Sequence, residues 1–148
     1  MTSYELIKIS SKNGNIVFYA THSNYMIDKK HLDRNIRVVK INNESTQLDF
    51  ISQKNSTYSE VNFTVFNIPT TDYHNELYGY LFDVKGKELE NFDKDRIWIN
   101  ELTKKEEKVS LPKYIRNSIH HPENTSNKRF SERQLRKSIE LLRKLKYK

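Results

Sequence analysis

A run of five apolar residues near the start of the chain, residues 16–20, restricts the possible folds more than any other feature. Its length is that of a β-strand, and the lack of polar positions is typical of a strand covered on both faces in a parallel sheet. Residues 4–11 before it predict the end of a helix that stops at Gly14. A helix end, a turn and a buried strand form the second half of an α/β crossover unit. Because only three residues precede Tyr4, we expect the chain to begin in the middle of a fold, with neighbouring strands supplied by other sequence.

Two short strand patterns follow and predict a β-hairpin. Residues 37–40 and 46–50 have the composition of strands, and Asn42 and Asn43 join them in a loop longer than the minimal hairpin turn. Residues 52–64 are rich in Ser, Asn and Thr, which is typical of a linker. We therefore predict three parts: a partial α/β region over residues 1–51, a linker over 52–70, and a mainly helical basic tail over 71–148.

The last part contains the clearest helix signals. Residues 72–84 place apolar side chains at helical spacing, and Gly86 is the predicted stop. Ser131 and Gln134 form a capping box ahead of an amphipathic helix that continues almost to the end of the chain. The residues between these helices support one firm prediction, contact of Trp98 with the core.

Positive charge is concentrated in the last third of the chain. Residues 101–148 contain 14 basic and six acidic side chains, a net charge of +8, whereas residues 1–100 contain 12 basic and 13 acidic side chains, a net charge of −1. A basic segment attached to a nearly neutral body predicts contact with phosphate, in nucleic acid or a nucleotide, or with an acidic protein face. The candidate nucleic-acid contacts on the last helix are Arg133, Arg136 and Lys137, and the alternative is a solvated basic helix.

Several classes of protein are not expected from this sequence. The chain has no Cys, so it can form no disulfide, no thiolate zinc site and no cysteine nucleophile. No window approaches the roughly 20 apolar residues of a membrane span, and residues 1–11 lack the order of a signal peptide. We therefore expect a cytoplasmic protein with no membrane partner. Only 35% of the residues are hydrophobic and 30% are charged, which predicts a thin core.

His22 follows the apolar run in a polar turn, Thr21-His22-Ser23. In open α/β sheets ligands bind at the carboxyl ends of the strands, where an imidazole can contact a terminal phosphate or orient the attacking water. From its position alone, His22 is a candidate phosphate contact, and a structural histidine is the alternative.

The sequence around this turn resembles a known family. Residues 16–37, with Tyr25, Met26 and Arg34 after the Thr-His-Ser turn, resemble the end of the nucleotide-binding core in ABC-type ATPases, labelled AAA, of the overcoming-lysogenization-defect group. The family's usual Pro after the turn is Asn24 here. The resemblance implies a P-loop ATPase sheet in which His22 is the switch histidine that senses the γ-phosphate, with Thr21 and Ser23 beside it in the nucleotide site.

The chain lacks the residues that would hold the nucleotide itself. Glycines occur only at positions 14, 79 and 86, so there is no P-loop, and no apolar strand ending in Asp-Glu precedes residue 4 to hold Mg²⁺. We expect ATP and Mg²⁺ to bind only where a complete core is supplied, and no ATP hydrolysis by the chain alone. The resemblance thus implies a truncated or split C-terminal segment of an ATPase, in a phage-defence or DNA-repair-like system, whose partner is the N-terminal ATPase part.

A second cluster of reactive side chains lies in the basic tail. Arg116 and His120 are four positions apart and so face the same way on a helix, which Pro122 would end directly after His121. Arginine can clamp a phosphate and histidine titrates near neutrality, a combination suited to metal-independent attack of an RNA 2′-hydroxyl on its own phosphate. The structural alternative is an ion pair of Arg116 with Glu123, with histidines that cap the helix end.

Arg116-Asn117 followed by His121 also resembles the Arg-Asn-x-x-x-His motif of HEPN ribonuclease domains, which are helical bundles that pair to form an active cleft. This resemblance implies that Arg116 and His121 are catalytic and that the partner is a second copy of the chain. Asn117 and His120 are candidate nucleic-acid contacts beside them. A shared metal is not expected without the distant His22, His31 or His74, because His120 and His121 point in different directions on any regular element.

Three functions are therefore open: an ATPase segment that is inactive alone, a HEPN-like ribonuclease, and an interaction module whose basic tail binds nucleic acid or an acidic protein.

Overall fold

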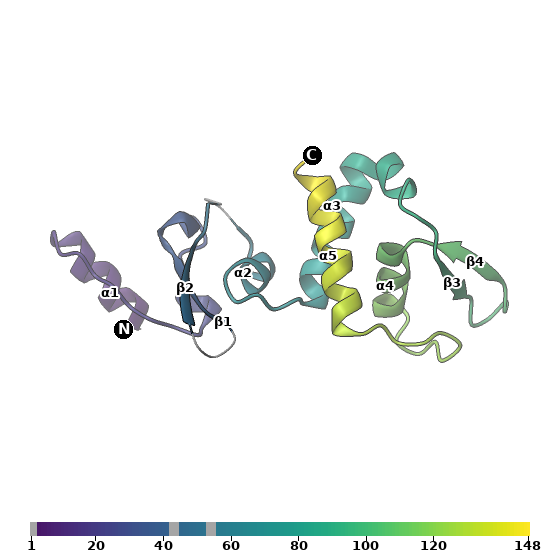
Figure 1. Ribbon diagram of the computed structural model, residues 1–148, viewed down its shortest axis with the longest axis horizontal. Helices are drawn as coiled ribbons and strands as arrows, with labels where there is room; N and C mark the ends of the chain where they lie inside the picture. Colours follow the sequence, from purple (N-terminus) through teal and green to yellow (C-terminus); the bar gives the residue numbers. More distant parts are fainter. Residues whose placement is uncertain (1–2, 42–44, 53–55) are drawn as a thin grey trace. The chain divides into compact units, whose positions relative to one another are not determined.

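The computed structural model describes residues 3–41, 45–52 and 56–148, and it divides into two compact units, Met1–Phe66 and Asn67–Lys148 (Figure 1). Each unit combines helices with a two-stranded antiparallel sheet, so the fold is mixed α/β. Within these three stretches, no helix has both the length and the apolar character that crossing a membrane requires.

The first unit is built from short elements around a small core. Its elements are α1 (Ser3–Lys12), the 3-10 helices η1 (Asn24–Met26) and η2 (Leu32–Arg34), β1 (Ile36–Ile41), β2 (Ser45–Phe50) and α2 (Tyr58–Thr64). Helix α1 confirms the predicted helix end, and Gly14 just beyond it has a φ of +81°, the left-handed conformation that commonly follows a helix. The buried side chains cluster in one place: Ile27, Leu32, Ile51, Val61 and Val65.

The predicted buried strand at residues 16–20 is wrong. These residues belong to no helix or strand, and Ile16 and Phe18 are 85% and 88% exposed. A strand requires a neighbour that pairs with its N–H and C=O groups. In the described part of the chain the two sheets are the hairpins β1–β2 and β3–β4, and neither pairs with this segment.

The predicted hairpin is confirmed. Strands β1 and β2 pair antiparallel, with Ile36 opposite Phe50 and Val38 opposite Leu48. The expected turn residues Asn42 and Asn43 lie outside the described residues. Residues that are directly opposite each other share a face of the sheet, so these four apolar side chains form one surface, here called the hairpin face. All four are exposed, Phe50 by 70% and Val38 by 65%.

The segment predicted as a linker, residues 52–70, contains helix α2 as well as the boundary between the two units after Phe66. Thr57 caps this helix because its Oγ1 atom accepts from the Glu60 N–H at 3.3 Å. Val61 and Val65 lie one turn apart and are buried. The helix therefore forms because two apolar side chains and a cap outweigh the low helix propensity of the neighbouring Ser, Asn and Thr residues.

The second unit contains α3 (Thr71–Glu90), β3 (Arg96–Ile99), β4 (Glu106–Val109), α4 (Leu111–His120) and α5 (Glu132–Lys146). Helix α3 packs against both α4 and α5, and α4 packs against α5 and β3 (Figure 1). The tail is therefore helical, as predicted, but it also holds a small sheet. Its core is formed by apolar side chains from all three helices: Tyr73, Leu77, Leu81, Ile115, Ile139 and Leu142.

Helix α3 is longer than predicted. Gly86 does not end it: the backbone leaves helical geometry at Lys85, with φ −138° and ψ 37°, and the helix then continues to Glu90. The extra turn buries Leu89, which is 5% exposed. The predicted capping box at the start of α5 is confirmed, since Ser131 Oγ accepts from the Gln134 N–H and Gln134 Oε1 accepts from the Ser131 N–H. The predicted core contact of Trp98 is confirmed by its packing with Val109 and Tyr114.

The turn between β3 and β4 holds a lysine in a left-handed conformation. Asn100 Oδ1 accepts from the N–H groups of Leu102 and Thr103, and Lys104 follows with a φ of +53°. A side chain at such a φ costs about 1–2 kcal/mol, whereas glycine costs about 0.5–1 kcal/mol of extra chain entropy.

We therefore predict that Lys104→Gly raises the unfolding free energy of the second unit by about 0.5–1 kcal/mol. The measurement is urea unfolding followed by the fluorescence of Trp98, the only tryptophan. Lys105→Gly is the matched control, because Lys105 does not have a positive φ and the same replacement there should lower stability by about the same amount. Equal destabilisation by both variants would contradict the prediction.

Candidate functional site

Helix α4 presents the predicted reactive residues at its C-terminal end. Its inner face is buried, whereas Arg116 and His120 are exposed; the buried residues are Leu111, Pro112, Tyr114, Ile115 and Ser118. The helix ends at His120, and His121 has the non-helical angles φ −124° and ψ 64°. This confirms the predicted end of the helix before Pro122.

Arg116 lies against helix α3. Its guanidinium carbon is 5.3 Å from the centre of the Tyr78 ring, a cation–π contact, and the side chain is exposed. Burial raises the pKa of Tyr78, an effect that the positive charge of Arg116 partly opposes. The ring is therefore neutral at physiological pH and holds one face of the guanidinium.

His121 lies against strand β3 and beside an acidic side chain. Its ring centre is 6.3 Å from that of Trp98, and its Nδ1 atom is 3.2 Å from Oε1 of Glu123. Both side chains are more than half exposed. A hydrogen bond from the backbone N–H of Glu123 to its own carboxylate and the contact with His121 lower the pKa of Glu123. The ionised carboxylate can fix the tautomer of the imidazole and leave Nε2 for proton transfer.

The structure does not bring Arg116 and His121 together within one chain. Arg116 contacts α3, whereas His121 contacts β3, so the two side chains leave α4 in different directions. The alternative ion pair between Arg116 and Glu123 is wrong, because the Glu123 carboxylate contacts the imidazole of His121, whereas Arg116 lies against Tyr78. Asn117 is half-buried and its carbonyl accepts from the His121 N–H at 2.8 Å, while His120 is exposed.

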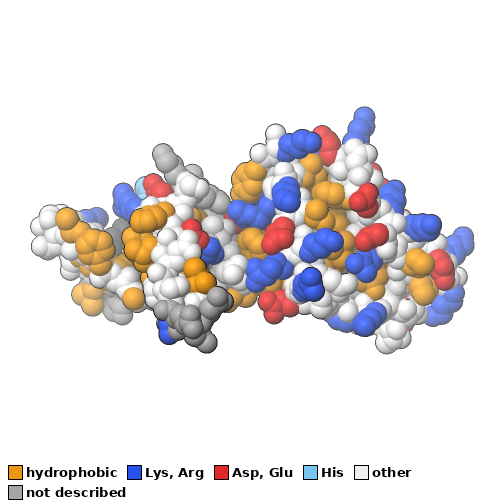
Figure 2. Space-filling view, in the orientation of Figure 1, with side chains coloured by type: hydrophobic (Ala, Val, Ile, Leu, Met, Phe, Trp, Pro, Cys, Tyr) orange, Lys and Arg blue, Asp and Glu red, His pale blue; other side chains and the backbone are white. Residues whose placement is uncertain are grey.

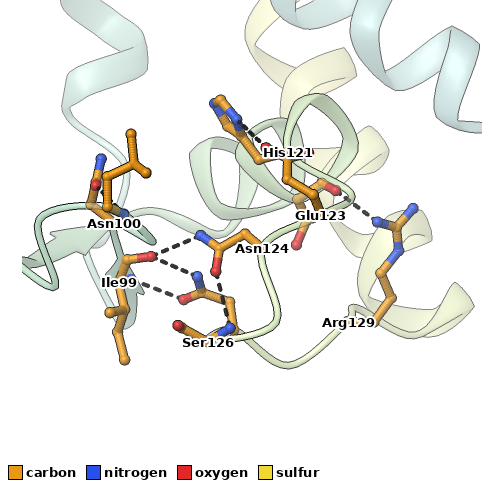
Figure 3. A network of polar contacts seen from close by, with 10 residues as sticks. Ile99, Asn100, His121, Glu123, Asn124, Ser126 and Arg129 are labelled. Atoms are coloured by element: carbon orange, nitrogen blue, oxygen red, sulfur yellow. Dashed lines mark hydrogen bonds and ion pairs between the residues drawn. The ribbon is translucent and has the colours of Figure 1, made fainter.

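The loop after α4 is held by polar contacts that the sequence analysis missed (Figure 3). The Asn124 side-chain amide donates to the Ile99 carbonyl at 2.9 Å, and the Arg129 guanidinium donates to the Ser118 carbonyl at 2.7 Å. Asn127 also binds Ile99, through both its N–H and its carbonyl. The sequence does mark a loop rich in Asn and Ser, residue types whose side chains bind backbone groups, but it does not indicate the distant strand that these side chains bind.

The basic residues of α5 divide into two groups. Arg133 and Lys137 are exposed, whereas Arg136 donates at 2.8 Å to both the side-chain and the backbone oxygen of Asn67. Arg136 also lies 3.8 Å from Glu132. Figure 2 shows basic side chains over much of this face of the second unit, with acidic ones among them. Of the three predicted contacts on α5, Arg133 and Lys137 are thus presented to solvent and Arg136 is engaged in the structure.

A buried histidine lies outside this site. His74 of α3 is fully buried, and its Nε2 atom is 2.9 Å from the Ser138 hydroxyl of α5. Burial lowers the pKa of His74 to about 4, with a further lowering by the positive charge of Arg116. This imidazole is neutral near pH 7 and has no path to a substrate, so it belongs to the core.

The residues of the predicted nucleotide site lie in the first unit. Thr21 and Ser23 form a local turn, in which the Ser23 N–H donates to Thr21 Oγ1 at 3.0 Å, and His22 between them is exposed. No glycine forms a phosphate cradle: Gly79 and Gly86 lie within α3, and Gly14 follows the end of α1. These residues do not fit a nucleotide site by themselves. Among the described residues, no group of three or more His, Asp or Glu side chains could hold a metal ion.

Comparison with protein-family models, with curated proteins and with solved structures finds no match to this chain.

Proposed function

We propose that the second unit binds RNA and cleaves it without a metal ion, with Arg116 and His121 as the catalytic residues. The observation that carries this proposal is the pairing of an exposed imidazole with a carboxylate, His121 with Glu123, at the end of the helix that also exposes Arg116. A carboxylate that orients an imidazole is a recurrent arrangement in general acid–base catalysis. The net positive charge of the tail supports attraction to the phosphate backbone.

In the proposed reaction, the neutral Nε2 atom of His121 accepts the proton of a ribose 2′-hydroxyl. The 2′-oxygen then attacks the adjacent phosphorus, and the bond to the 5′-oxygen of the next nucleotide breaks. The Arg116 guanidinium stabilises the negative charge that develops on the phosphate oxygens. The leaving oxygen takes a proton from water, so the products are a 2′,3′-cyclic phosphate and a 5′-hydroxyl.

The directions of the two side chains support a site made by two copies of the chain. Because Arg116 and His121 leave α4 on different sides, an arginine from one copy can meet the histidine of the other. Residues Asn117 and His120 lie between them along the chain, and Arg133 and Lys137 would add contacts to phosphate.

The test is cleavage of fluorescent single-stranded RNA by the purified chain in excess EDTA, with analysis of the fragment ends. We expect cleavage with 2′,3′-cyclic phosphate ends. Intact RNA at a high excess of protein would overturn the proposal. Salt-sensitive binding without cleavage would instead support the interaction module.

Mixing two inactive variants tests the composite site. If each site takes Arg116 from one copy and His121 from the other, an equal mixture of Arg116→Ala and His121→Ala should recover about a quarter of the wild-type activity, because half of the randomly formed pairs then contain one intact site. A mixture that stays inactive would contradict a site shared between copies.

A second candidate function concerns the first unit. We propose that it completes the nucleotide-binding core of an ATPase of the overcoming-lysogenization-defect group, with His22 as the switch histidine. The supporting observation is its exposed apolar side chains, since Ile16, Phe18 and the hairpin face are all open to solvent. The hairpin face is an apolar patch, and exposed apolar patches are typical of docking sites.

The test is co-expression with a protein that carries a P-loop and a strand ending in Asp-Glu, followed by copurification and assay of ATP hydrolysis with Mg²⁺. We expect a stable complex whose ATPase activity is lost in His22→Ala. Failure to copurify with any such protein encoded beside this chain would count against the candidate.

A further inference from the structure

The loop that carries His121 is fastened to the outer edge of strand β3. Ile99 donates its N–H to Asn127 Oδ1 at 2.9 Å, and its carbonyl accepts from Asn127 Nδ2 at 2.8 Å. The same carbonyl accepts from Asn124 Nδ2 at 2.9 Å (Figure 3). One side-chain amide therefore binds both backbone groups of Ile99, as a neighbouring strand would.

Asn124 connects this edge to the imidazole. Its backbone N–H donates to the His121 carbonyl at 3.2 Å, and its Oδ1 atom accepts from the Ser126 N–H at 3.0 Å. Asn124 alone thus links Ile99 to His121, by one hydrogen bond to the carbonyl of each. On the same strand, Trp98 is the ring against which His121 lies.

We propose that Asn124 and Asn127 are positioning residues that fix the imidazole of His121 against Trp98 and so in its reactive orientation. The role in catalysis rests on the proposed ribonuclease function, whereas the placement of the imidazole does not. Both asparagines are only half-buried and contact the loop and the strand edge rather than the core formed by the helices. Their removal therefore affects the loop more than the folding of the unit.

The fluorescence of Trp98 tests the placement directly, because Trp98 is the only tryptophan and the imidazole of His121 lies against its ring. At constant pH we expect His121→Ala to change the emission of Trp98, and the measured quantity is this difference in emission between proteins with and without the substitution. Asn127→Ala and Asn124→Ala should each remove at least half of this difference. Thr125→Ala, an exposed position between them, is the matched control and should retain it.

RNA cleavage tests the consequence for catalysis. We expect Asn127→Ala to lower kcat about tenfold and to change KM less than about twofold, since a small displacement of a catalytic group affects the chemical step more than binding. Circular dichroism and urea unfolding of the same proteins show whether the variants are folded.

The two claims, that the asparagines position His121 and that this position matters for catalysis, are decided by different outcomes. An unchanged fluorescence difference in a folded Asn127→Ala variant overturns the placement by the asparagines. A lost fluorescence difference with unchanged kcat overturns their role in catalysis. If the wild-type chain cleaves no RNA, the proposed function fails, and the fluorescence result still decides whether the asparagines position His121.

Discussion

Replacing His121 by alanine is expected to lower the rate of RNA cleavage by about 10²- to 10⁴-fold, the usual contribution of a general acid or base. The imidazole has the geometry for this role, because Glu123 binds one ring nitrogen and the side chain is exposed. The end of α4 should stay in place, since the backbone N–H at position 121 still donates to the Asn117 carbonyl. The measurement is the single-turnover rate on fluorescent single-stranded RNA in EDTA.

The neighbouring His120 provides the control. It is also exposed but is the last residue of α4, so its side chain leaves the helix in another direction. We expect His120→Ala to weaken RNA binding and to leave the rate at saturating protein within about threefold of wild type. Equal losses in both variants would indicate a general effect of positive charge, and an unchanged rate in His121→Ala would assign the cleavage to another group.

The second large effect is acid destabilisation of the second unit through His74. Burial is the main reason why the pKa of this imidazole is about 4 in the folded chain, below the ordinary histidine value of 6.5. Above pH 6.5 the neutral form of His74 predominates in both the folded and the unfolded chain, so its protonation does not lower the unfolding free energy there. As the pH falls from 6.5 towards 4, the unfolded chain binds a proton that the folded chain does not, which lowers the unfolding free energy. At about 1.4 kcal/mol for each pH unit, the loss by pH 4 is about 3 kcal/mol.

Urea unfolding at pH 7, 5.5 and 4, followed by Trp98 fluorescence, measures this effect. The groups around the imidazole are the Ser138 hydroxyl, the stacked ring of Tyr78, the Asn75 side chain and the Arg116 guanidinium, and none of them is acidic. No carboxylate is thus available among these neighbours to stabilise the protonated form. His74→Gln is the control, because it removes the titrating group while keeping a polar side chain beside Ser138. The same loss of stability in this variant would assign the acid sensitivity to other residues.

Elements that depend on local signals were predicted well from the sequence. The capping box at Ser131 and Gln134 places the start of α5, and the composition of residues 37–50 places the β1–β2 hairpin. Both signals act between residues that are close along the chain. Helix α3 shows the limit of such signals, because the burial of Leu89 carries it beyond Gly86.

The errors concern features that depend on distant partners. An apolar run such as residues 16–20 becomes a strand only when neighbouring strands pair with it, and the described residues supply none. Helix α2 was not predicted because most of its residues are polar, and the two buried valines that pack it against the core gave too weak a pattern. In both cases the secondary structure of the segment depended more on its contacts than on its composition.

The candidate site was predicted in part. The residues of α4 and the position of the helix end follow from the spacing of Arg116, His121 and Pro122. The attachment of the loop to Ile99 does not, because it joins side chains to a strand that precedes them by more than 20 positions. The same holds for the bond between His74 and Ser138, whose residues are 64 positions apart.

The hydrogen bonds from Arg136 to Asn67 have a consequence for how the second unit can be combined with other sequence. Asn67 is the first residue of that unit and has a φ of +57°, and α5 is its last helix. The residue at which the chain enters the unit is thus bound to the unit's own last helix, by two hydrogen bonds of 2.8 Å each. We therefore expect the second unit to keep its fold when it is joined to different N-terminal neighbours.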